Sequence, residues 1–169
     1  NKVYDKLSRC YECFRNKVDF KPEIALVLGS GLGDFADGIE VVCELDYHEI
    51  EGFPVSTVPG HQGKYIFGYV GDVPVVCMQG RVHYYEGAKV LFLTNAGGGV
   101  NYDFRPGDFM LIKDQISSFV PSPLIGENID ELGARFPDMS EIYDISLRKV
   151  IKKTAAELDI DLKVYRTGI

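Results

Sequence analysis

The chain has 169 residues, of which 46% are hydrophobic and 25% charged, and its formal net charge is −7 at pH 7. This length can bury one sizeable hydrophobic core, so we expect a single domain over residues 1–169. The negative net charge argues against a nucleic-acid-binding protein, because such proteins present clustered positive charge to the phosphate backbone.

The sequence also disfavours membrane-spanning and disulfide-rich classes. No apolar run approaches the roughly 20 residues that cross a bilayer, and the N-terminus lacks the pattern of a signal peptide. We therefore expect a cytoplasmic protein without a membrane partner. The cysteines are few and scattered, which predicts free thiols at Cys10, Cys13, Cys43 and Cys77. Cys10 and Cys13 form a CxxC pair, but it lies within a helical pattern without a second pair of ligands, so we expect no metal site.

The first predicted elements are a helix, a strand and a glycine-rich turn. From Val3 onward, apolar residues recur at three- and four-residue spacing, which predicts an amphipathic helix that ends near Asn16. The apolar run 24–28 is typical of a strand buried on both faces of a sheet. It leads into the glycine-rich turn 29–33, whose backbone N–H groups, with the Ser30 hydroxyl, are suited to bind an anion.

The same glycines raise a different interpretation. Gly31, Gly33 and Ala36 match the GxGxxG/A pattern of a dinucleotide-binding unit. In such a unit the glycines open a crossover helix of about a dozen residues, but here Gly38 interrupts the pattern early. An NAD-binding oxidoreductase therefore stays a minor alternative.

A predicted hairpin delivers the most polar stretch of the chain. Two strands, 64–70 and 73–78, are joined by Gly71-Asp72, a favoured two-residue hairpin turn. The second strand leads at once into a segment that holds Arg81, His83, Tyr85 and Glu86. Ligands collect beyond the carboxyl ends of strands in parallel α/β sheets, so we expect chemistry here. A guanidinium group also matches two oxygens of a phosphate or carboxylate.

Two more loops are candidates for contact with a ligand. The turn-rich segment 53–63 carries His61 between two glycines. The loop 95–99 reads Asn-Ala-Gly-Gly-Gly and follows the predicted strand 89–94, as the first glycine-rich turn follows its own strand. Two such loops on one sheet favour a site for an anion or a nucleoside.

The connection between two of these strands is unusually short. If the strands that end at Gln79 and Thr94 are parallel, a crossover of about a dozen residues is needed. The segment 80–88 is shorter and has no helical pattern. Either the two strands form an antiparallel pair, or a helix is absent from this chain.

The last third of the chain contains two more strands and a helix. Strands are predicted over 109–112 and 162–166, with a long irregular segment over 117–137. Asp138 and Glu141 have the spacing of a helix-capping pair. The following residues present an apolar helical face for packing, formed by Tyr143, Leu147, Val150, Ile151 and Leu158.

Five motifs occur in order along nearly the whole chain. They are Gly29-Ser-Gly-Leu-Gly33, Pro59-Gly-His61-Gln-Gly63, Gln79-Gly-Arg-Val-His-Tyr-Tyr-Glu-Gly87, Thr94-Asn-Ala-Gly-Gly-Gly99 and Arg135-Phe-Pro-Asp-Met-Ser140. In this combination they resemble the trimeric purine nucleoside phosphorylase family. The resemblance implies an α/β fold with a mixed twisted central sheet flanked by helices. It also implies a homotrimeric pentosyltransferase of purine salvage, in which phosphate attacks the anomeric carbon of inosine or guanosine and releases the purine and pentose 1-phosphate.

Carried over position by position, the resemblance implies a role for each candidate residue. The phosphate would be bound by Ser30, His61, Arg81, His83 and the backbone of Ala96. Tyr85 and His83 would approach the ribose, and His83 and Glu86 would be the catalytic pair. Asn95, Ala96 and Gly97 would lie on the base side, and Phe119 would contact a neighbouring subunit. The resemblance implies inorganic phosphate as co-substrate, with no metal and no organic cofactor.

The chain departs from the family pattern in ways that leave alternatives open. From the resemblance we expect it to lack a crossover helix near 87–88 and a C-terminal part that contacts the base in the family, and Gly97 stands where the family usually has alanine. One alternative is therefore a non-catalytic phosphate- or nucleoside-binding fragment of the same fold. A methylthioadenosine phosphorylase ranks lower, because its strand-end motifs differ from those present here.

Overall fold

The computed structural model describes residues 2–29, 32–53, 63–79, 88–116, 121 and 125–168, with the backbone alone for 166–168. The chain forms two compact units, Asn1–Gly98 and Gly99–Ile169. The single domain expected over residues 1–169 stays a prediction.

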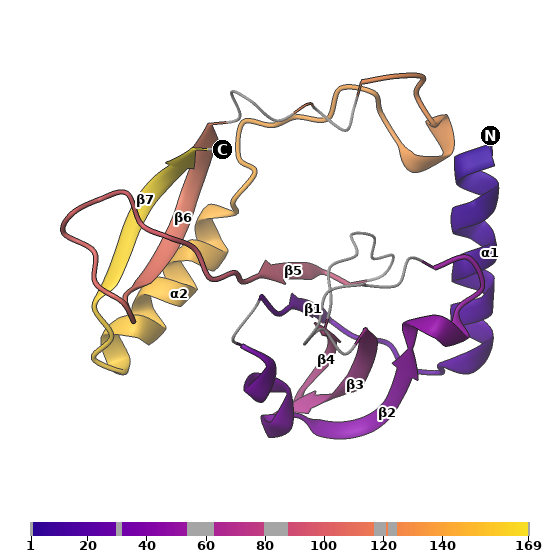
Figure 1. Cartoon of the computed structure of the whole chain (residues 1–169), viewed down its shortest axis with the longest axis horizontal. Helices are drawn as coiled ribbons and strands as arrows, with labels where there is room; N and C mark the ends of the chain where they lie inside the picture. Colours follow the sequence, from indigo (N-terminus) through magenta and orange to yellow (C-terminus); the bar gives the residue numbers. More distant parts are fainter. Residues whose placement is uncertain are drawn as a thin grey trace. The chain divides into compact units, whose positions relative to one another are not determined.

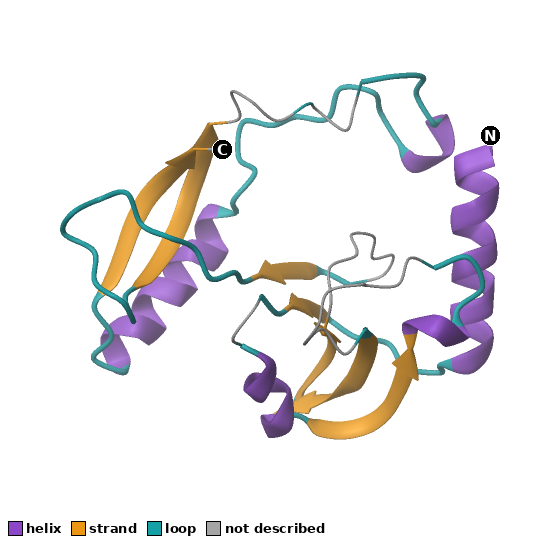
Figure 2. Cartoon of the chain, viewed as in Figure 1, coloured by secondary structure: helices purple, strands orange, loops and turns teal. Residues whose placement is uncertain are grey.

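The first unit is built on a five-stranded mixed sheet with the strand order β2-β3-β4-β1-β5 (Figure 1). Its strands are β1 (Ile24–Val27), β2 (Glu40–Asp46), β3 (Lys64–Val70), β4 (Val73–Gln79) and β5 (Val90–Leu93). β1 is parallel to β4 on one side and to β5 on the other, whereas β2, β3 and β4 are antiparallel neighbours. Among its described residues, the first unit also contains three helices (Figure 2). They are the α-helix α1 (Lys2–Lys17) and the 3-10 helices η1 (Gly33–Gly38) and η2 (Tyr47–Glu49).

The predicted hairpin is confirmed in residue range and in turn chemistry. β3 and β4 pair antiparallel through Val70 and Val73, with Gly71 and Asp72 between them. Gly71 has a φ of +58°, whereas Asp72 is not left-handed. A glycine in the first central position is typical of a type II′ turn, which matches the right-handed twist of the strands.

The antiparallel alternative for the strands that end at Gln79 and Thr94 is wrong. β4 and β5 run in the same direction, because both are parallel to β1. They are not neighbours, since β1 lies between them. The sequence could not show this arrangement, because the strand inserted between them comes from an earlier part of the chain.

Residues 32–46 contain no crossover helix of a dinucleotide-binding unit, as the early Gly38 indicated. After β1 the chain enters η1 and then β2, which pairs antiparallel with β3. A Rossmann unit would need a helix of about a dozen residues and then a parallel strand here. This topology disfavours the NAD-binding interpretation.

The central strands are buried on both faces, as the apolar runs predicted. In β4, Val76 and Met78 belong to a core cluster on one face, and Val75 and Cys77 belong to a cluster on the other. On the first face Phe14 of α1 packs against rings of β3, with centroid distances of 5.5 Å to Tyr65 and 5.6 Å to Phe67. The C-terminal half of α1 therefore packs against β3 through Phe14, whereas Val3 near its start is 55% exposed.

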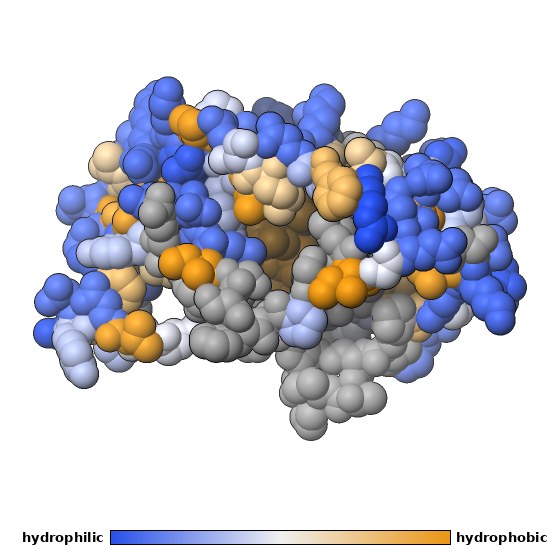
Figure 3. All heavy atoms as spheres, turned by 90° about the horizontal axis from the view of Figure 1, so that it is seen from above, coloured by the Kyte–Doolittle hydropathy of each residue, from blue (hydrophilic) through white to orange (hydrophobic). Residues whose placement is uncertain are grey.

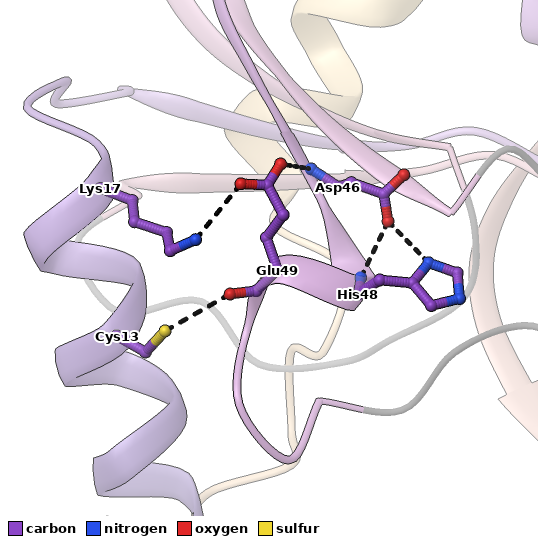
Figure 4. Close-up of polar contacts among 5 residues, drawn as sticks. All are labelled: Cys13, Lys17, Asp46, His48 and Glu49. Atoms are coloured by element: carbon purple, nitrogen blue, oxygen red, sulfur yellow. Dashed lines mark hydrogen bonds and ion pairs between the residues drawn. The ribbon is translucent and has the colours of Figure 1, made fainter.

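A polar cluster fixes the turn after β2 against α1 (Figure 4). The Asp46 carboxylate accepts a hydrogen bond from the His48 backbone N–H at 2.8 Å. It also accepts from the Glu49 backbone N–H, and the Glu49 carboxylate accepts from the Asp46 backbone N–H at 3.4 Å, so that these two reciprocal bonds form a capping box. Lys17 of α1 pairs with Glu49 at 3.2 Å, and the Cys13 thiol donates to the Glu49 carbonyl at 3.6 Å. These contacts hold the chain that leads toward residues 54–62.

The four thiols are free, as predicted. Cys10 is buried and donates to the Glu51 carbonyl at 3.1 Å. Cys77 is fully buried in β4. The two cysteines of the CxxC pair therefore link α1 to η2 and to the residues that follow it, through the carbonyls of Glu49 and Glu51.

The second unit contains a two-stranded parallel sheet and a helix. β6 (Phe109–Ile116) pairs with β7 (Leu162–Gly168), and α2 (Ile145–Glu157) connects them after the 3-10 helix η3 (Asp130–Leu132). The Tyr143 hydroxyl donates to Gln115 of β6 at 3.0 Å, and Arg148 of α2 donates to the Tyr143 carbonyl at 3.1 Å. These hydrogen bonds link the start of α2 to β6.

The predicted cap of this helix is wrong. The N-cap is Asp144, whose carboxylate accepts from the Leu147 backbone N–H at 2.8 Å. Asp138 instead accepts from the backbone and hydroxyl of Ser140, in a local turn. Both aspartates have the chemistry of a cap, and the helix begins at the later one.

The predicted apolar face of α2 is only partly buried. Leu147, Val150 and Leu158 are 39%, 60% and 64% exposed, whereas Ala155 is the buried residue of the helix. Hydrophobic side chains also lie among hydrophilic ones on the face of the molecule shown in Figure 3. The predicted packing face is therefore wrong in its residues, because none of them is buried and the buried Ala155 was not among them.

Candidate functional site

The site is built from strand ends that lie level with one another. In the sheet register Val27 of β1 is the partner of Met78 in β4 and of Leu93 in β5. Because the three strands are parallel, the segments that follow them leave the sheet at the same edge. These segments are the glycine-rich turn after β1, the polar stretch after β4 and the second glycine-rich loop after β5.

The turn after β1 touches the loop after β5. A Cβ placed on Gly29 would lie 2.5 Å from the Cα of Asn95 and 2.7 Å from the carbonyl oxygen of Thr94. Both are backbone atoms, so no side chain can move away to make room. Glycine at this position is therefore what allows the two loops to approach.

The side chain of Thr94 joins these two segments. Its hydroxyl accepts a hydrogen bond from the Gly29 backbone N–H at 3.2 Å and donates to the Val27 carbonyl at 3.1 Å. The Thr94 backbone N–H donates to the same carbonyl at 3.0 Å. The end of β1 is thus hydrogen-bonded to the end of β5 through backbone and side chain together.

The end of β4 contributes a further contact to the same turn. The Gln79 side-chain amide donates to the Gly33 carbonyl at 3.3 Å. Its side-chain oxygen is buried and has no hydrogen-bond partner among the described residues. Both ends of the glycine-rich turn are therefore hydrogen-bonded to other segments. Gly29 is bonded to Thr94, which follows β5, and Gly33 is bonded to Gln79 of β4.

The structure describes three of the predicted site residues, and all three are exposed beyond β5. Asn95 donates its side-chain amide to the Ala96 carbonyl at 3.4 Å. A Cβ on Gly97 would contact the Asn95 amide nitrogen at 3.6 Å, an ordinary van der Waals distance. The usual alanine of the family would therefore fit at this position, and the backbone of the loop does not require glycine there.

The remaining predicted site residues lie outside the described residues. Ser30 follows Gly29 directly, and the polar stretch that begins at Gly80 follows Gln79 directly. The residues concerned are Ser30, His61, Arg81, His83, Tyr85, Glu86 and Phe119. Their roles stay predictions.

The residues that the structure describes contain neither a candidate metal site nor a membrane-spanning helix. In that part of the chain, no group of three or more His, Cys, Asp and Glu side chains is placed to hold a metal ion. No helix there is long and apolar enough to cross a membrane.

Sequence reasoning missed Thr94 and Gln79 as contributors to the site. Each is the polar residue at which an apolar run ends, directly before a candidate loop. This position at the end of a strand was the sequence feature that could have identified them as site residues. Their contacts depend on β1 lying between β4 and β5, which the sequence alone does not show.

Comparison with known proteins places this geometry in a family. Residues 23–169 match the model of the Phosphorylase superfamily. Purine nucleoside phosphorylase 1 of Geobacillus stearothermophilus is 43% identical over 180 residues, which include 96% of this chain. The chain spans 65% of that relative's length.

Solved structures show the same fold. The purine nucleoside phosphorylase of Schistosoma mansoni in complex with acetate has a TM-score of 0.85 at 32% identity, over 98% of this chain and 69% of that one. Isoform 2 from the same organism, in complex with cytosine and ribose-1-phosphate, has a TM-score of 0.82 at 34% identity, over 98% and 66% of the two chains. The family model, the identities and the fold agree, and the chain belongs to the phosphorylase superfamily.

Proposed function

We propose that the protein is a purine nucleoside phosphorylase, which converts inosine- or guanosine-type nucleosides and phosphate to a free purine and pentose 1-phosphate. The similar proteins from Geobacillus stearothermophilus and Schistosoma mansoni carry this name, and one of the latter is in complex with ribose-1-phosphate. The proposal extends to a cytoplasmic homotrimer that acts in purine salvage, with phosphate as co-substrate and no organic cofactor or metal.

The observation that carries the proposal is the meeting of two loops at one edge of the sheet. The backbone of Gly29 lies against that of Asn95, where the parallel strands β1 and β5 end. Loops of this kind present backbone N–H groups toward an anion. We assign phosphate binding to Ser30, Arg81, His83 and the backbone of Ala96, with His61 nearby.

The residue types fit the chemistry of phosphorolysis. The glycosidic bond breaks through a state in which positive charge develops on the ribose, so a positioned phosphate dianion stabilises that charge and then attacks the anomeric carbon. In this proposal Tyr85 and His83 contact the ribose, and Glu86 orients its neighbours. Asn95, Ala96 and Gly97 lie toward the base. The phosphate is the nucleophile, so no covalent protein nucleophile is needed.

Two measurements on the purified 169-residue chain test the proposal. The first is calorimetric titration with inorganic phosphate, on the native chain and on Arg81→Gln. The second is release of hypoxanthine from inosine, with and without phosphate. The matched control is Arg9→Gln, which makes the same change at an exposed position of α1. We expect the native chain and the control to bind phosphate, and Arg81→Gln to bind it at least tenfold more weakly, because a charge-assisted pair is worth roughly 1.5–3 kcal/mol.

The outcomes separate the candidate functions. Base release that requires phosphate supports a phosphorylase. Phosphate binding without base release favours the non-catalytic alternative. Base release that is independent of phosphate, or a native chain that does not bind phosphate, contradicts the proposal.

A further inference from the structure

The hydroxyl of Thr94 makes one hydrogen bond as donor and one as acceptor, both near the end of β1. It accepts from the Gly29 N–H and donates to the Val27 carbonyl, at 3.2 and 3.1 Å. A hydroxyl has one proton to donate, and here that proton is directed to Val27. The group is half-buried, so replacement by an apolar side chain would leave the Gly29 N–H without its partner.

These hydrogen bonds lie just beyond the regular pairing of the two strands. The last paired residues of β1 and β5 are Val27 and Leu93. After this pair the strands no longer form a ladder, and the Thr94 side chain supplies the next link between them. Without it, the Thr94 backbone N–H would still donate to the Val27 carbonyl at 3.0 Å, but no hydrogen bond from Thr94 would reach Gly29.

We infer that Thr94 is a positioning residue of the phosphate site. It fixes the backbone at Gly29, which leads into Ser30, against the backbone at Asn95, which leads into Ala96. The inference rests on the proposed function, because it concerns the distance between two groups of phosphate donors. Thr94 acts through its neighbours, since its side-chain hydrogen bonds are made to Val27 of β1 and to Gly29 in the turn that follows.

Two substitutions at Thr94 separate its hydroxyl from its shape. Thr94→Val keeps the branched side chain and removes both hydrogen bonds, whereas Thr94→Ser keeps the hydroxyl and loses a methyl group. The matched control is Thr154→Val, which makes the same change at an exposed position of α2. Threonine and valine have similar helix propensities, so this control should fold normally.

Phosphate affinity is the decisive measurement, made by calorimetry under conditions in which every variant is folded. We expect Thr94→Val to weaken phosphate binding about tenfold, the loss expected when one or two hydrogen bonds that fix the donors are removed. Thr94→Ser should retain affinity within about threefold of the native chain, and Thr154→Val should match it. Hydrogen exchange of the Gly29 amide should become faster in Thr94→Val but not in Thr94→Ser.

Failure of this inference can be distinguished from failure of the proposed function. If the native chain binds phosphate and Thr94→Val binds it equally well, the role of Thr94 is overturned and the proposed function stands. A purely structural role would give this result, with lower stability but unchanged affinity. If the native chain does not bind phosphate, the proposed function is overturned and the assigned role of Thr94 is overturned with it.

Discussion

Gly29 lies where the backbones of β1 and β5 come together beyond their last paired residues. We expect Gly29→Ala to destabilise the first unit, because the added Cβ would lie 2.5 Å from the Cα of Asn95 and only a shift of one strand can relieve the overlap. Overpacking of this kind typically costs about 1–3 kcal/mol. The measurement is the urea midpoint of unfolding, followed by far-UV circular dichroism.

Gly33→Ala is the matched control for this change. A Cβ on Gly33 meets nothing within 4 Å, and its backbone is not left-handed. This variant should keep the native midpoint or raise it slightly, because alanine restricts the unfolded chain. Equal midpoints for the two variants would mean that the strands at Gly29 can separate freely, and the close approach would lose its importance for the site.

At the scale of elements, the start of α2 tests which aspartate caps the helix. We expect Asp144→Ala to lower the melting temperature of the second unit by several degrees, because the Leu147 N–H loses its acceptor at 2.8 Å. Asp144→Asn should retain most of the stability, since asparagine is also a good N-cap. The measurement is thermal unfolding followed by circular dichroism.

Asp138→Ala provides the contrast. Asp138 has the sequence pattern of the cap but accepts hydrogen bonds from Ser140 in a turn before the helix. Its replacement should leave the melting temperature close to that of the native chain. A larger loss for Asp138→Ala than for Asp144→Ala would show that the helix begins where the sequence pattern placed it.

The elements were predictable where local patterns are strong. The periodicity of α1 and the Gly71-Asp72 turn of the hairpin each specify a structure from neighbouring residues alone, and both are confirmed. The start of α2 was not predictable, because two aspartates offer similar capping chemistry. The local pattern cannot decide which aspartate caps the helix. In the structure, the side chain of Arg148 donates to the Tyr143 carbonyl directly before Asp144, a contact that accompanies the later helix start.

The sequence located the two glycine-rich loops after their strands, but it did not show how the strands are assembled. Glycine-rich segments after apolar runs indicated anion-binding loops at Gly29 and Asn95, and the structure brings these two segments into contact. The order of the strands, with β1 between β4 and β5, depends on pairing between distant parts of the chain. The contact of Thr94 with Gly29 follows from that order, so no local pattern could reveal it.

At the scale of the whole molecule, a buried thiol and two buried phenol groups in the first unit make its stability depend on alkaline pH. Burial raises the pKa of the Cys77 thiol from its ordinary value of 9.0 to about 11. Burial also raises the pKa values of the Tyr47 and Tyr65 hydroxyls. All three side chains lie in the two core clusters of the sheet. Their ionisation in the folded state would place charge in an apolar environment.

The sign of the pH effect follows from which state loses its protons first. Above pH 9 the thiol of Cys77 ionises in the unfolded chain but stays protonated in the folded chain until about pH 11. The unfolded state therefore binds fewer protons in this window, and the free energy of unfolding falls as the pH rises. The stability is complete below pH 9, and the loss assigned to Cys77 is at most roughly 2–3 kcal/mol by pH 11.

Urea unfolding of the native chain and of Cys77→Ala at pH 8 and pH 11 measures this contribution. The variant should start from a lower stability, because a buried side chain is shortened, but it should lose less between the two pH values. Cys43→Ala is the control, since it makes the same change at a half-buried thiol of β2 and should keep most of the native fall. Tyr47 and Tyr65 remain in both variants, so some alkaline loss should persist. If Cys77→Ala falls as steeply as the native chain, the Cys77 thiol does not stay protonated through this window, and the alkaline sensitivity belongs to the two tyrosines.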